Sequence, residues 1–530
     1  MFGIAFLLGL FGNVIFAFGI LQEYEFLSLL AITCIFGFLS IIFWDKFEKK
    51  ISIKNIAKNI KEILFEYPYI FCFIIASLGL MLVGALGPEL AFDSLWYHLT
   101  IPKIYLENGG ISYIPGGLLY YSTMPKLGEM LYIPALALSG EVLVKIVHMT
   151  FALLTAIATY QLSRKFASVF YSLISVVILF TNIVFLWEGT TAYIDLIRTF
   201  FEVMALFGLI EYFNTKKSKW LIESAFLMGL SIETKLISLA TFLVLIILIA
   251  VFDRRGINTF KKIIMYGVIS LFVPLGWFVF SFLSTSNPFY PLFSVYNIHF
   301  EKDVLVFPSI FFDIFTIFIS SSDPISPFYL IIAPIYFMIR NKIPSKTNVI
   351  FLFCILALLV WTITPKTGGG RFLLPYLPAF SIASAVILET IKKYKNYYRV
   401  LIIVLIFVCV VALLYRGLAV SKYMPAIFGK ESKESFLMSH LNFKFGDFYD
   451  EDHSIKKIVG DKNVLLYGFH NLYYVDFPFI DSSWVKKGDT FEFIATQNTS
   501  LPKRFQYWNV IYSNDTTGVK LYTTNTRWIY

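Results

Sequence analysis

Apolar stretches long enough to cross a membrane recur along most of this chain. About 20 helical residues cover a hydrocarbon core of roughly 30 Å, and runs of that order alternate with polar segments up to residue 420. They predict helices near residues 2–20, 26–43, 69–86, 141–160, 168–187, 194–212, 264–284, 327–340, 349–363, 372–390 and 400–420. Residues 1–420 are therefore expected to form an α-helical polytopic membrane domain with about 11–13 transmembrane helices. Met1–Leu21 is predicted to be a signal anchor that stays in the membrane.

The apolar stretch 221–252 has a different pattern. Glu233, Thr234 and Lys235 divide it into pieces of 12 and 17 residues, and at 1.5 Å per residue the first piece reaches only about 18 Å. Because that length is too short to span, we expect a hairpin that enters and leaves on one side of the membrane.

Basic residues indicate how the helices are oriented. With the N-terminus inside, the inner connections 44–67, 161–168, 213–220, 252–262, 340–348 and 391–399 contain 22 Lys and Arg residues. The outer connections 87–140, 188–198, 285–326 and 364–371 contain six, namely Lys103, Lys126, Arg198, Lys302, Lys366 and Arg371. Because basic loops mark the cytoplasmic side, we expect a multi-pass protein of the cell (plasma) membrane with a cytoplasmic N-terminus and an extracytoplasmic C-terminal segment.

The composition agrees with a membrane protein and excludes other classes. Of the 530 residues, 58% are hydrophobic and 15% charged, whereas soluble domains carry about 25% charged residues. The last 110 residues contain 13 Lys and Arg against 12 Asp and Glu, so the net charge of +9 comes mainly from the membrane part, and no nucleic-acid partner is expected. The cysteines lie in apolar runs without metal-ligand spacing, and disulfides are not expected there.

Two outer loops and the C-terminal tail are the unusual segments. The loops 87–140 and 285–326 are rich in aromatic residues, Pro and Gly. The tail 421–530 alternates aromatic and polar residues around turn signals such as Tyr467-Gly468 and Lys487-Gly488-Asp489, which predicts a small extracytoplasmic α/β domain. Transporters place their sites near the bilayer midplane, whereas here the unusual chemistry is predicted at the outer surface.

The first long loop begins with a candidate carboxylate site. Pro88 suits the first position of a helix and Glu89 its first turn, which predicts a helix over 88–107 along the membrane surface. Glu89, Asp93 and Tyr97 would then share one face. The two acids either form a site there or simply solvate an interfacial helix.

A second acid lies at the outer end of the helix predicted over 194–212. Acids at the membrane boundary are candidates for function, which makes Asp195 one, unless it pairs with Arg198 one turn later. The nearby Glu188 is interpreted as a solvated acid of the loop.

Three basic residues are candidates for binding an anion. Lys235 lies in an apolar stretch, where it either pairs with a carboxylate such as Glu233 or points toward a ligand phosphate. Arg371 follows three glycines at the outer end of a membrane helix, where a guanidinium and flexible backbone amides suit a phosphate at headgroup level. Snorkelling into the headgroup region is the alternative for Arg371 and for Lys366.

Metal and acid–base chemistry have weaker signals. His98 lies off the face of Asp93, and a hydrogen-bonded structural histidine is the alternative to a base or ligand. Asp450 and Asp452 form an Asp-x-Asp pair of the kind that nucleotide-sugar enzymes use for a metal, or else a solvated linker. No cofactor is indicated with certainty, and a divalent metal ion stays open because no convincing ligand set can be assembled.

The order of several motifs resembles the GT-C glycosyltransferases, in particular the protein O-mannosyltransferase and aminoarabinose-transferase (family 39) type. Their first outer loop looks like the run Asp93–Leu99 followed by Pro102-Lys103, Tyr105-Leu106, Pro125 and Glu129-Met130-Leu131-Tyr132. Further motifs follow in order, namely Ala192-Tyr193-Ile194-Asp195, Thr234-Lys235, Asn287-Pro288-Phe289-Tyr290-Pro291 and Arg371-Phe372-Leu373-Leu374-Pro375. The resemblance covers residues from about 85 to 380.

The resemblance implies the inverting transfer of a hexose or pentose from a polyprenyl-phosphate donor to an acceptor on the outer face, either a lipid, a glycan or a protein. Carried over by position, Asp93 would be the base that activates the acceptor and Asp195 a second acid of the site. Relatives often have two adjacent acids at the base position, but Ser94 follows Asp93 here, and Glu89 is the candidate for the second carboxylate.

The same comparison suggests which residues bind substrate. Lys235, Lys366 and Arg371 would hold the lipid phosphate as its charge develops. Tyr97, His98 and Glu129, which lie in the matched loop, are predicted to line the substrate site.

Two other classes of function are compatible with the sequence. A transporter or flippase for a lipid-linked glycan would move its substrate unchanged and place key charges at mid-depth. A non-catalytic scaffold would depend more on the tail 421–530 than on Asp93.

Overall fold

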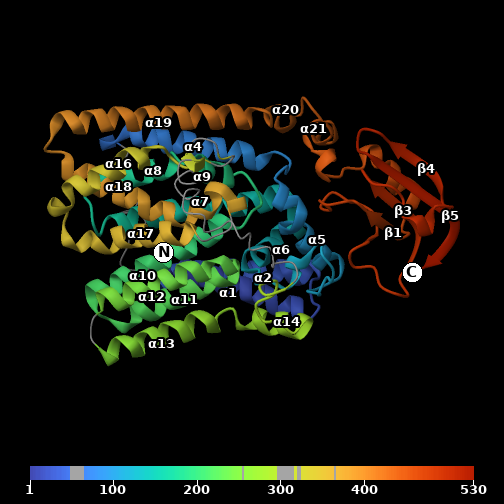
Figure 1. Cartoon of the computed structure of the whole chain (residues 1–530), viewed down its shortest axis with the longest axis horizontal. Coiled ribbons are helices and arrows are strands. Elements are labelled where there is room, and N and C mark those ends of the chain that lie inside the picture. The colour runs from blue at the N-terminus through green and yellow to red at the C-terminus, as the bar shows by residue number, and fades with distance from the viewer. Residues whose placement is uncertain (48–64, 254–255, 295–315, 319–320, 322–323, 363–365) are drawn as a thin grey trace.

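A bundle of helices and a small sheet domain lie end to end in the computed structural model of the chain (Figure 1). It describes residues 1–530 except 48–64, 254–255, 295–315, 319–320, 322–323 and 363–365. The bundle contains α1 (Phe2–Ile20), α2 (Phe26–Phe47), α4 (Pro68–Leu86), α5 (Thr100–Glu107), α6 (Leu127–Ser139), α7 (Glu141–Ser163), α8 (Val169–Phe180), α9 (Ile183–Glu188), α10 (Asp195–Thr215), α11 (Ser218–Thr234), α12 (Leu239–Phe252), α13 (Ile257–Phe272), α14 (Leu275–Thr285), α16 (Phe328–Ile339), α17 (Asn348–Thr362), α18 (Leu377–Ile391) and α19 (Lys395–Ser421).

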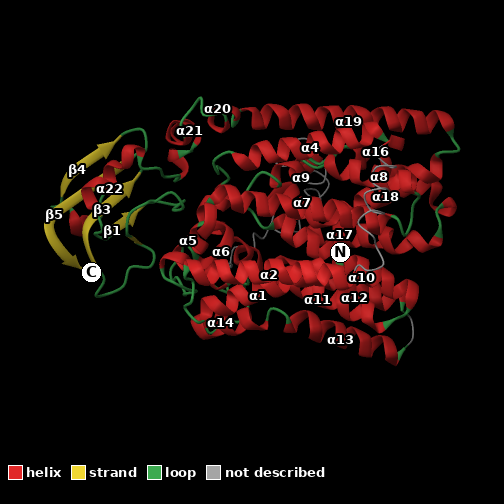
Figure 2. Cartoon of the chain, turned by 180° about the vertical axis from the view of Figure 1, so that it is seen from behind, coloured by secondary structure: helices red, strands yellow, loops and turns green. Residues whose placement is uncertain are grey.

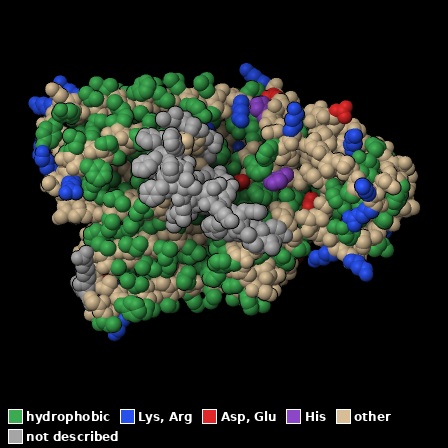
Figure 3. All heavy atoms as spheres, viewed as in Figure 1, with side chains coloured by type: hydrophobic (Ala, Val, Ile, Leu, Met, Phe, Trp, Pro, Cys, Tyr) green, Lys and Arg blue, Asp and Glu red, His purple; other side chains and the backbone are tan. Residues whose placement is uncertain are grey.

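The predicted class, a polytopic helical membrane protein, is confirmed. Six described helices are long and apolar enough to cross a membrane, and the bent pair α13–α14 can form a seventh span. Hydrophobic side chains cover much of the bundle's visible face, and Lys and Arg gather at the end far from the sheet (Figure 3). The predicted 11–13 spans include helices that do not meet these criteria of length and composition. Some of those helices are short, and α10 contains four charged residues, Asp195, Arg198, Glu202 and Glu211, that are buried inside the protein.

Two helices expected to be continuous are broken. The stretch 168–187 forms α8 and α9, because the Asn182 side-chain amide donates to the carbonyls of Ile178 and Leu179 and ends α8 there. The stretch 264–284 forms α13 and α14, which meet at 60°. Pro274 lies at that break, where its missing N–H interrupts the helical hydrogen bonds.

The predicted hairpin 221–252 corresponds to α11 and α12. The first helix is longer than the sequence suggested, because it begins at Ser218, and its 17 residues reach about 25 Å. The chain then breaks at Lys235 and returns through α12. Both ends lie together, since Asp253 after α12 accepts contacts from Lys216 before α11 and from Lys262.

The first outer loop is more ordered than expected. The helix predicted over 88–107 begins only at Phe92, forms a π-helical turn over Ser94–His98 (η1) and continues as α5 after a break at Leu99. The second half of the loop contains α6, an apolar helix packed against α1 and α7. Most of the second long loop, 285–326, lies outside the described residues.

The tail forms the predicted small α/β domain. It contains α20 (Met424–Ile427), α21 (Lys433–His440), α22 (Ser454–Val459), β1 (Val464–Tyr467), β2 (Phe479–Asp481), β3 (Thr490–Gln497), β4 (Asn509–Asn514) and β5 (Val519–Ile529). The sheet has the order β2-β1-β3-β5-β4, in which β1 is parallel to β2 and β3 and the other pairs are antiparallel. Figure 2 shows the sheet beyond the end of the bundle, connected through α20 and α21.

The C-terminal domain docks on the first outer loop. Lys103 of α5 donates to the carbonyls of Tyr473, at 3.0 Å, and of Val475. The Tyr473 amide donates to the Leu95 carbonyl, and the Tyr474 hydroxyl donates to the Glu89 carbonyl. The tail therefore holds the segment that contains Asp93.

A glycine substitution tests this docking. A Cβ added at Gly116 would lie 2.0 Å from the Ser483 carbonyl oxygen, whereas one at Gly109 would meet nothing within 4 Å, and both glycines have positive φ. Gly116→Ala should therefore loosen the C-terminal domain and speed proteolytic cleavage between α19 and β1. Gly109→Ala should cost only the backbone strain of about 1 kcal/mol. Equal cleavage rates for the two variants would contradict the docking contact.

Candidate active site

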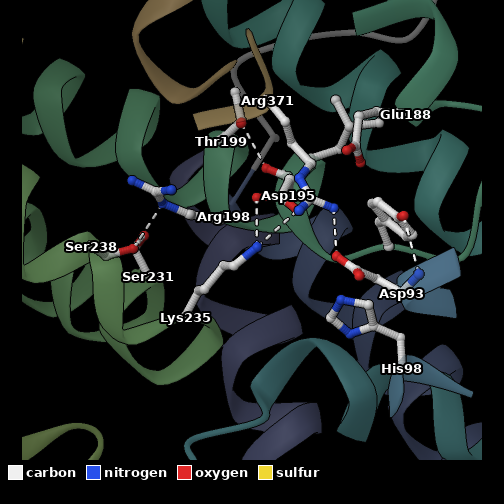
Figure 4. A network of polar contacts seen from close by, with 12 residues as sticks. Asp93, His98, Glu188, Asp195, Arg198, Thr199, Ser231, Lys235, Ser238 and Arg371 are labelled. Carbon is white, nitrogen blue, oxygen red and sulfur yellow. Dashed lines mark hydrogen bonds and ion pairs between the residues drawn. The ribbon is translucent and has the colours of Figure 1, made fainter. Parts of the chain in front are cut away.

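Four charged residues from distant parts of the chain form a cluster (Figure 4), next to the loop segment on which the C-terminal domain docks. An Arg371 Nη1 to Asp93 Oδ2 distance of 2.6 Å joins the first outer loop to η7 (Lys366–Tyr376). Lys235 Nζ lies 3.0 Å from both carboxylate oxygens of Asp195. Arg371 lies between the two carboxylates and interacts electrostatically with both.

The backbone around Arg371 explains its position. Gly369 has φ 51° and ψ −138°, a conformation that a side chain strongly disfavours, so the glycines allow η7 to turn sharply before α18. The guanidinium carbon then lies 4.8 Å from the centre of the Tyr193 ring, a cation–π distance. Tyr193 also accepts a hydrogen bond from the Asp93 amide through its hydroxyl, so one residue supports both partners of the ion pair.

Asp93 and Tyr97 share a helical face, as predicted. The Tyr97 hydroxyl lies 3.3 Å from Asp93 Oδ2 and donates to it. Burial, followed by the charge of Asp93, raises the pKa of Tyr97 well above its usual value, so the phenol stays protonated. Asp93 is 14% exposed and can be reached by a substrate, whereas the side chain of Asp195 is fully buried.

Aromatic rings from both domains pack on the loop segment that contains Asp93. Phe92 and Trp96 flank it in the loop, and the imidazole of His470 from the C-terminal domain lies 4.8 Å and 4.7 Å from their rings. Tyr121 packs 4.4 Å from Tyr97. Flat aromatic surfaces of this kind can pack on the apolar face of a sugar, and His470 brings the C-terminal domain against the same loop segment.

Glu89 does not share the face of Asp93, because it precedes the helix. Its Oε1 accepts hydrogen bonds from the amides of Leu90 and Ala91, and its Oε2 accepts one from the amide of Ala192 at 2.7 Å. With 1% exposure and these amides bound, Glu89 fastens the first outer loop to the segment before α10. The prediction of a common carboxylate face is therefore wrong for Glu89.

His98 and Glu129 form a buried pair next to the cluster. His98 Nδ1 lies 2.8 Å from Glu129 Oε1, and Lys126 approaches the same oxygen at 3.8 Å. Burial lowers the pKa of His98 below its usual value, although Glu129 opposes the shift, so the imidazole is neutral near pH 7. This arrangement fits the structural histidine that the sequence offered as the alternative.

Several charged residues have other partners in the structure than the sequence predicted. Arg198 pairs with Glu202 at 2.7 Å rather than with Asp195. Glu233 accepts a hydrogen bond from Asn13 at 3.0 Å rather than pairing with Lys235. Each local pairing was plausible by spacing, but the helices turn these side chains toward other neighbours.

Three further residues have positions that the sequence analysis did not anticipate. Glu188 is fully buried beside the cluster rather than solvated in a loop (Figure 4). Asp450 is buried and caps α22 by accepting from the amides of Ile455 and Lys456, so the solvated-linker interpretation is wrong for it, whereas Asp452 is exposed. The side chain of Lys366 lies outside the described residues.

Two residues of the site were missed. Tyr193 was quoted as part of a motif but given no role. His148 on α7 holds the start of α10, since its Nε2 accepts from the Leu196 amide and its Nδ1 donates to the Thr191 carbonyl. A polar residue inside an apolar run was the available signal for His148. In the described part of the chain, no group of three or more His, Cys, Asp or Glu side chains is arranged to hold a metal ion.

Comparisons with known proteins show a shared fold. No family model matches the sequence, and no curated protein matches it. The structure is similar to crystal structures of ArnT from Cupriavidus metallidurans, bound to undecaprenyl phosphate and in the apo state, each with a TM-score of 0.58 and 13% identity over 87% of this chain and 98% of that chain. A match to the oligosaccharyltransferase AglB from Archaeoglobus fulgidus, in complex with an inhibitory peptide and a dolichol-phosphate, has a TM-score of 0.43 and 11% identity over 82% of this chain and 70% of that chain.

The Lys235–Asp195 pair can be tested as a structural element. Lys235→Met leaves a fully buried carboxylate without this partner and should lower the free energy of unfolding by about 3 kcal/mol. Asp195→Asn combined with Lys235→Met should restore most of the loss, as measured by thermal unfolding in detergent. The control is Lys219→Met on the same helix, whose exposed pair with Glu223 contributes at most about 1 kcal/mol. Equal destabilisation by Lys219→Met and Lys235→Met would contradict the assignment.

Proposed function

Because the chain has the GT-C fold, as its motif order predicted, we propose that it is an inverting glycosyltransferase. It would move a sugar from a polyprenyl-phosphate donor to a lipid, glycan or protein acceptor at the outer face of the plasma membrane. The observation that carries this proposal is the Asp93–Arg371–Asp195–Lys235 cluster, in which two cations and an accessible carboxylate meet at the end of the bundle beneath the C-terminal domain.

The two cations are placed to hold a phosphate. Arg371 and Lys235 lie on the same aromatic ring, 5.7 Å and 5.8 Å from the centre of Phe372. Both are partly accessible, with side-chain exposures of 14% and 16%. Arg371 Nε has no hydrogen-bond partner among the described residues, so the guanidinium has a donor to spare for a ligand. Phosphate oxygens accept well from such charged donors.

The charge balance of the cluster suggests how the reaction would begin. The two cations and two carboxylates of the cluster balance in charge, and Arg371 forms an ion pair with Asp93. A donor phosphate would compete for Arg371 and release the Asp93 carboxylate. Asp93 would then take the proton of the acceptor hydroxyl as the acceptor oxygen bonds to the anomeric carbon.

Bond breaking accompanies this step on the opposite face of the sugar. The bond between the anomeric carbon and the phosphate oxygen breaks, and its electron pair leaves on the polyprenyl phosphate. Arg371 and Lys235 would hold that negative charge as it develops. Asp195 is fully buried, so we assign it a positioning role, in which it orients Lys235 rather than touching substrate.

A flippase accounts less well for these positions. The key charges of a flippase should lie at mid-depth in the membrane. The charged pair below the cluster is instead buried, with each side chain 1% exposed, and Arg198 Nε lies 2.7 Å from Glu202 Oε1. The accessible charges lie instead at the end of the bundle. We also propose that the N-terminus is cytoplasmic and the C-terminal domain extracytoplasmic, which places Asp93 and the tail on the side where the acceptor is found.

Asp93→Asn tests the proposed base. Purified protein would be incubated with radiolabelled polyprenyl-phosphate sugars and a crude envelope acceptor fraction. Loss of a general base lowers rates by about 10²–10⁴-fold, so the variant should transfer almost no label while thermal unfolding in detergent shows that it is still folded. Glu107→Gln, which removes an exposed acid from α5, should transfer normally. Wild-type turnover by Asp93→Asn would refute the assignment, and label that crosses a proteoliposome bilayer without transfer would favour the flippase.

Arg371 can be tested separately through the donor. Arg371→Met should reduce kcat/KM for the lipid-linked sugar by about 10²–10³-fold, and Arg371→Lys should restore part of the rate because it keeps the charge but not the planar fork. The KM for the acceptor should change little in both variants. A loss confined to the acceptor KM would show that Arg371 does not bind the donor phosphate.

A further inference from the structure

A small cavity opens between α9 and α19, apart from the charged cluster. It has a volume of about 240 Å³, and its lining includes Trp187, Thr190, Tyr415, Arg416, Lys422 and Tyr423. It lies at the same end of the bundle as Asp93, because Tyr423 packs against Gly87 at the start of the first outer loop. Two of its lining residues are cations that the proposed reaction does not use.

Arg416 is buried without an acidic partner. It lies on the inward face of α19 with Ala412 and Val420 and is 5% exposed. Its Nη2 contacts the Thr190 hydroxyl at 3.4 Å, and its Nε has no hydrogen-bond partner among the described residues. Within that part of the chain, no carboxylate forms an ion pair with Arg416 or Lys422. A buried guanidinium with free donors and no counter-charge is costly unless an anion completes the site.

The surroundings of Arg416 carry further positive charge. Lys145 Nζ and Lys422 Nζ lie 5.4 Å and 5.2 Å from the centre of the Tyr423 ring. Lys145 donates to the carbonyls of Gly87 and Pro88. The nearby acid, Glu89, accepts from three backbone amides rather than from Arg416, and its negative charge acts on Lys145 and Lys422.

The depth of the cavity matches the lipid headgroups. Arg416 precedes the last residue of α19 by five positions, about 7.5 Å along the helix, and Lys422 follows that residue directly. Trp187, Tyr415 and Tyr423 line the cavity, and tryptophan and tyrosine are the residues that concentrate at the membrane–water interface. Tyr415 and Leu418 are 51% and 77% exposed, so this side of α19 faces the lipid.

We propose that this cavity binds the phosphate group of a membrane lipid. Arg416 would donate to the phosphate from within the helix bundle, with Thr190 beside it and Lys422 closing the site from the aqueous side. The site is distinct from Arg371 and Lys235, and Trp187 separates the two. The ring of Trp187 lies 5.3 Å from that of Tyr193, on which Arg371 rests. The inference concerns binding and stands without the proposed glycosyl transfer.

Native mass spectrometry of the detergent-purified full chain tests the proposal with dioleoyl phosphatidic acid as the probe. Wild type should bind one molecule that Arg416→Gln and Lys422→Gln bind about tenfold more weakly, the loss of roughly one charged hydrogen bond. Lys422 is exposed, so its variant keeps the test valid if Arg416→Gln fails to fold. Lys430→Gln removes an equivalent exposed charge just beyond α19 and should bind like wild type, as should Arg371→Met.

Four results would overturn the proposal. Unchanged binding by both Arg416→Gln and Lys422→Gln would show that the cavity does not hold the phosphate. An equal loss in Lys430→Gln would indicate general surface attraction. A loss in Arg371→Met alone would place the lipid at the charged cluster. Displacement of the lipid by millimolar inorganic phosphate would identify a free anion as the ligand. Dioleoyl phosphatidylcholine that binds as tightly as phosphatidic acid would support a diester headgroup as well as a monoester.

Discussion

The ion pair between Arg371 and Asp93 is the contact on which the arrangement of the site depends. It connects residues 278 positions apart and fixes the first outer loop against the start of α18. Tyr193 contributes to both sides, since its hydroxyl accepts from the Asp93 amide and its ring lies under the guanidinium. Because these side chains join the loop, η7 and the segment before α10, a ligand that competes for Arg371 would act on all three.

The two carboxylates of the cluster have separate environments, and this separates their roles. Asp195 is fully buried and bound through both oxygens to Lys235. Asp93 is partly exposed and accepts a hydrogen bond from the Tyr97 hydroxyl. One acid therefore orients a cation, while the other can meet a substrate. His470 of the C-terminal domain packs on Phe92 and Trp96, which lie in the same loop segment as Asp93.

Sequence patterns predicted the members of the site better than their pairings. Long apolar runs and the order of the motifs predicted the helical membrane fold that the chain shares with ArnT, and the segments with Asp93, Asp195, Lys235 and Arg371, because each signal is local. Partners were wrong where the choice depended on packing, as for Arg198, which faces Glu202, and for Glu89, which precedes the helix it was assigned to. The π-helical turn over Ser94–His98 and the buried position of Glu188 also arise from tertiary contacts that no local spacing encodes.

Two aromatic side chains, Trp187 and Tyr193, connect the cavity around Arg416 with the charged cluster around Arg371. Arg416 lies in the lipid-facing cavity that Trp187 lines, Trp187 packs edge-on against Tyr193, and Tyr193 supports Arg371. A phosphate at Arg416 would fix the position of Trp187 and Thr190, and Gly84 of α4 packs closely enough on Thr190 that this corner has little room to adjust. A lipid headgroup in the cavity would therefore hold the Tyr193 ring in place. Because Arg371 packs on that ring, its position relative to Asp93 or to a donor phosphate would be held as well.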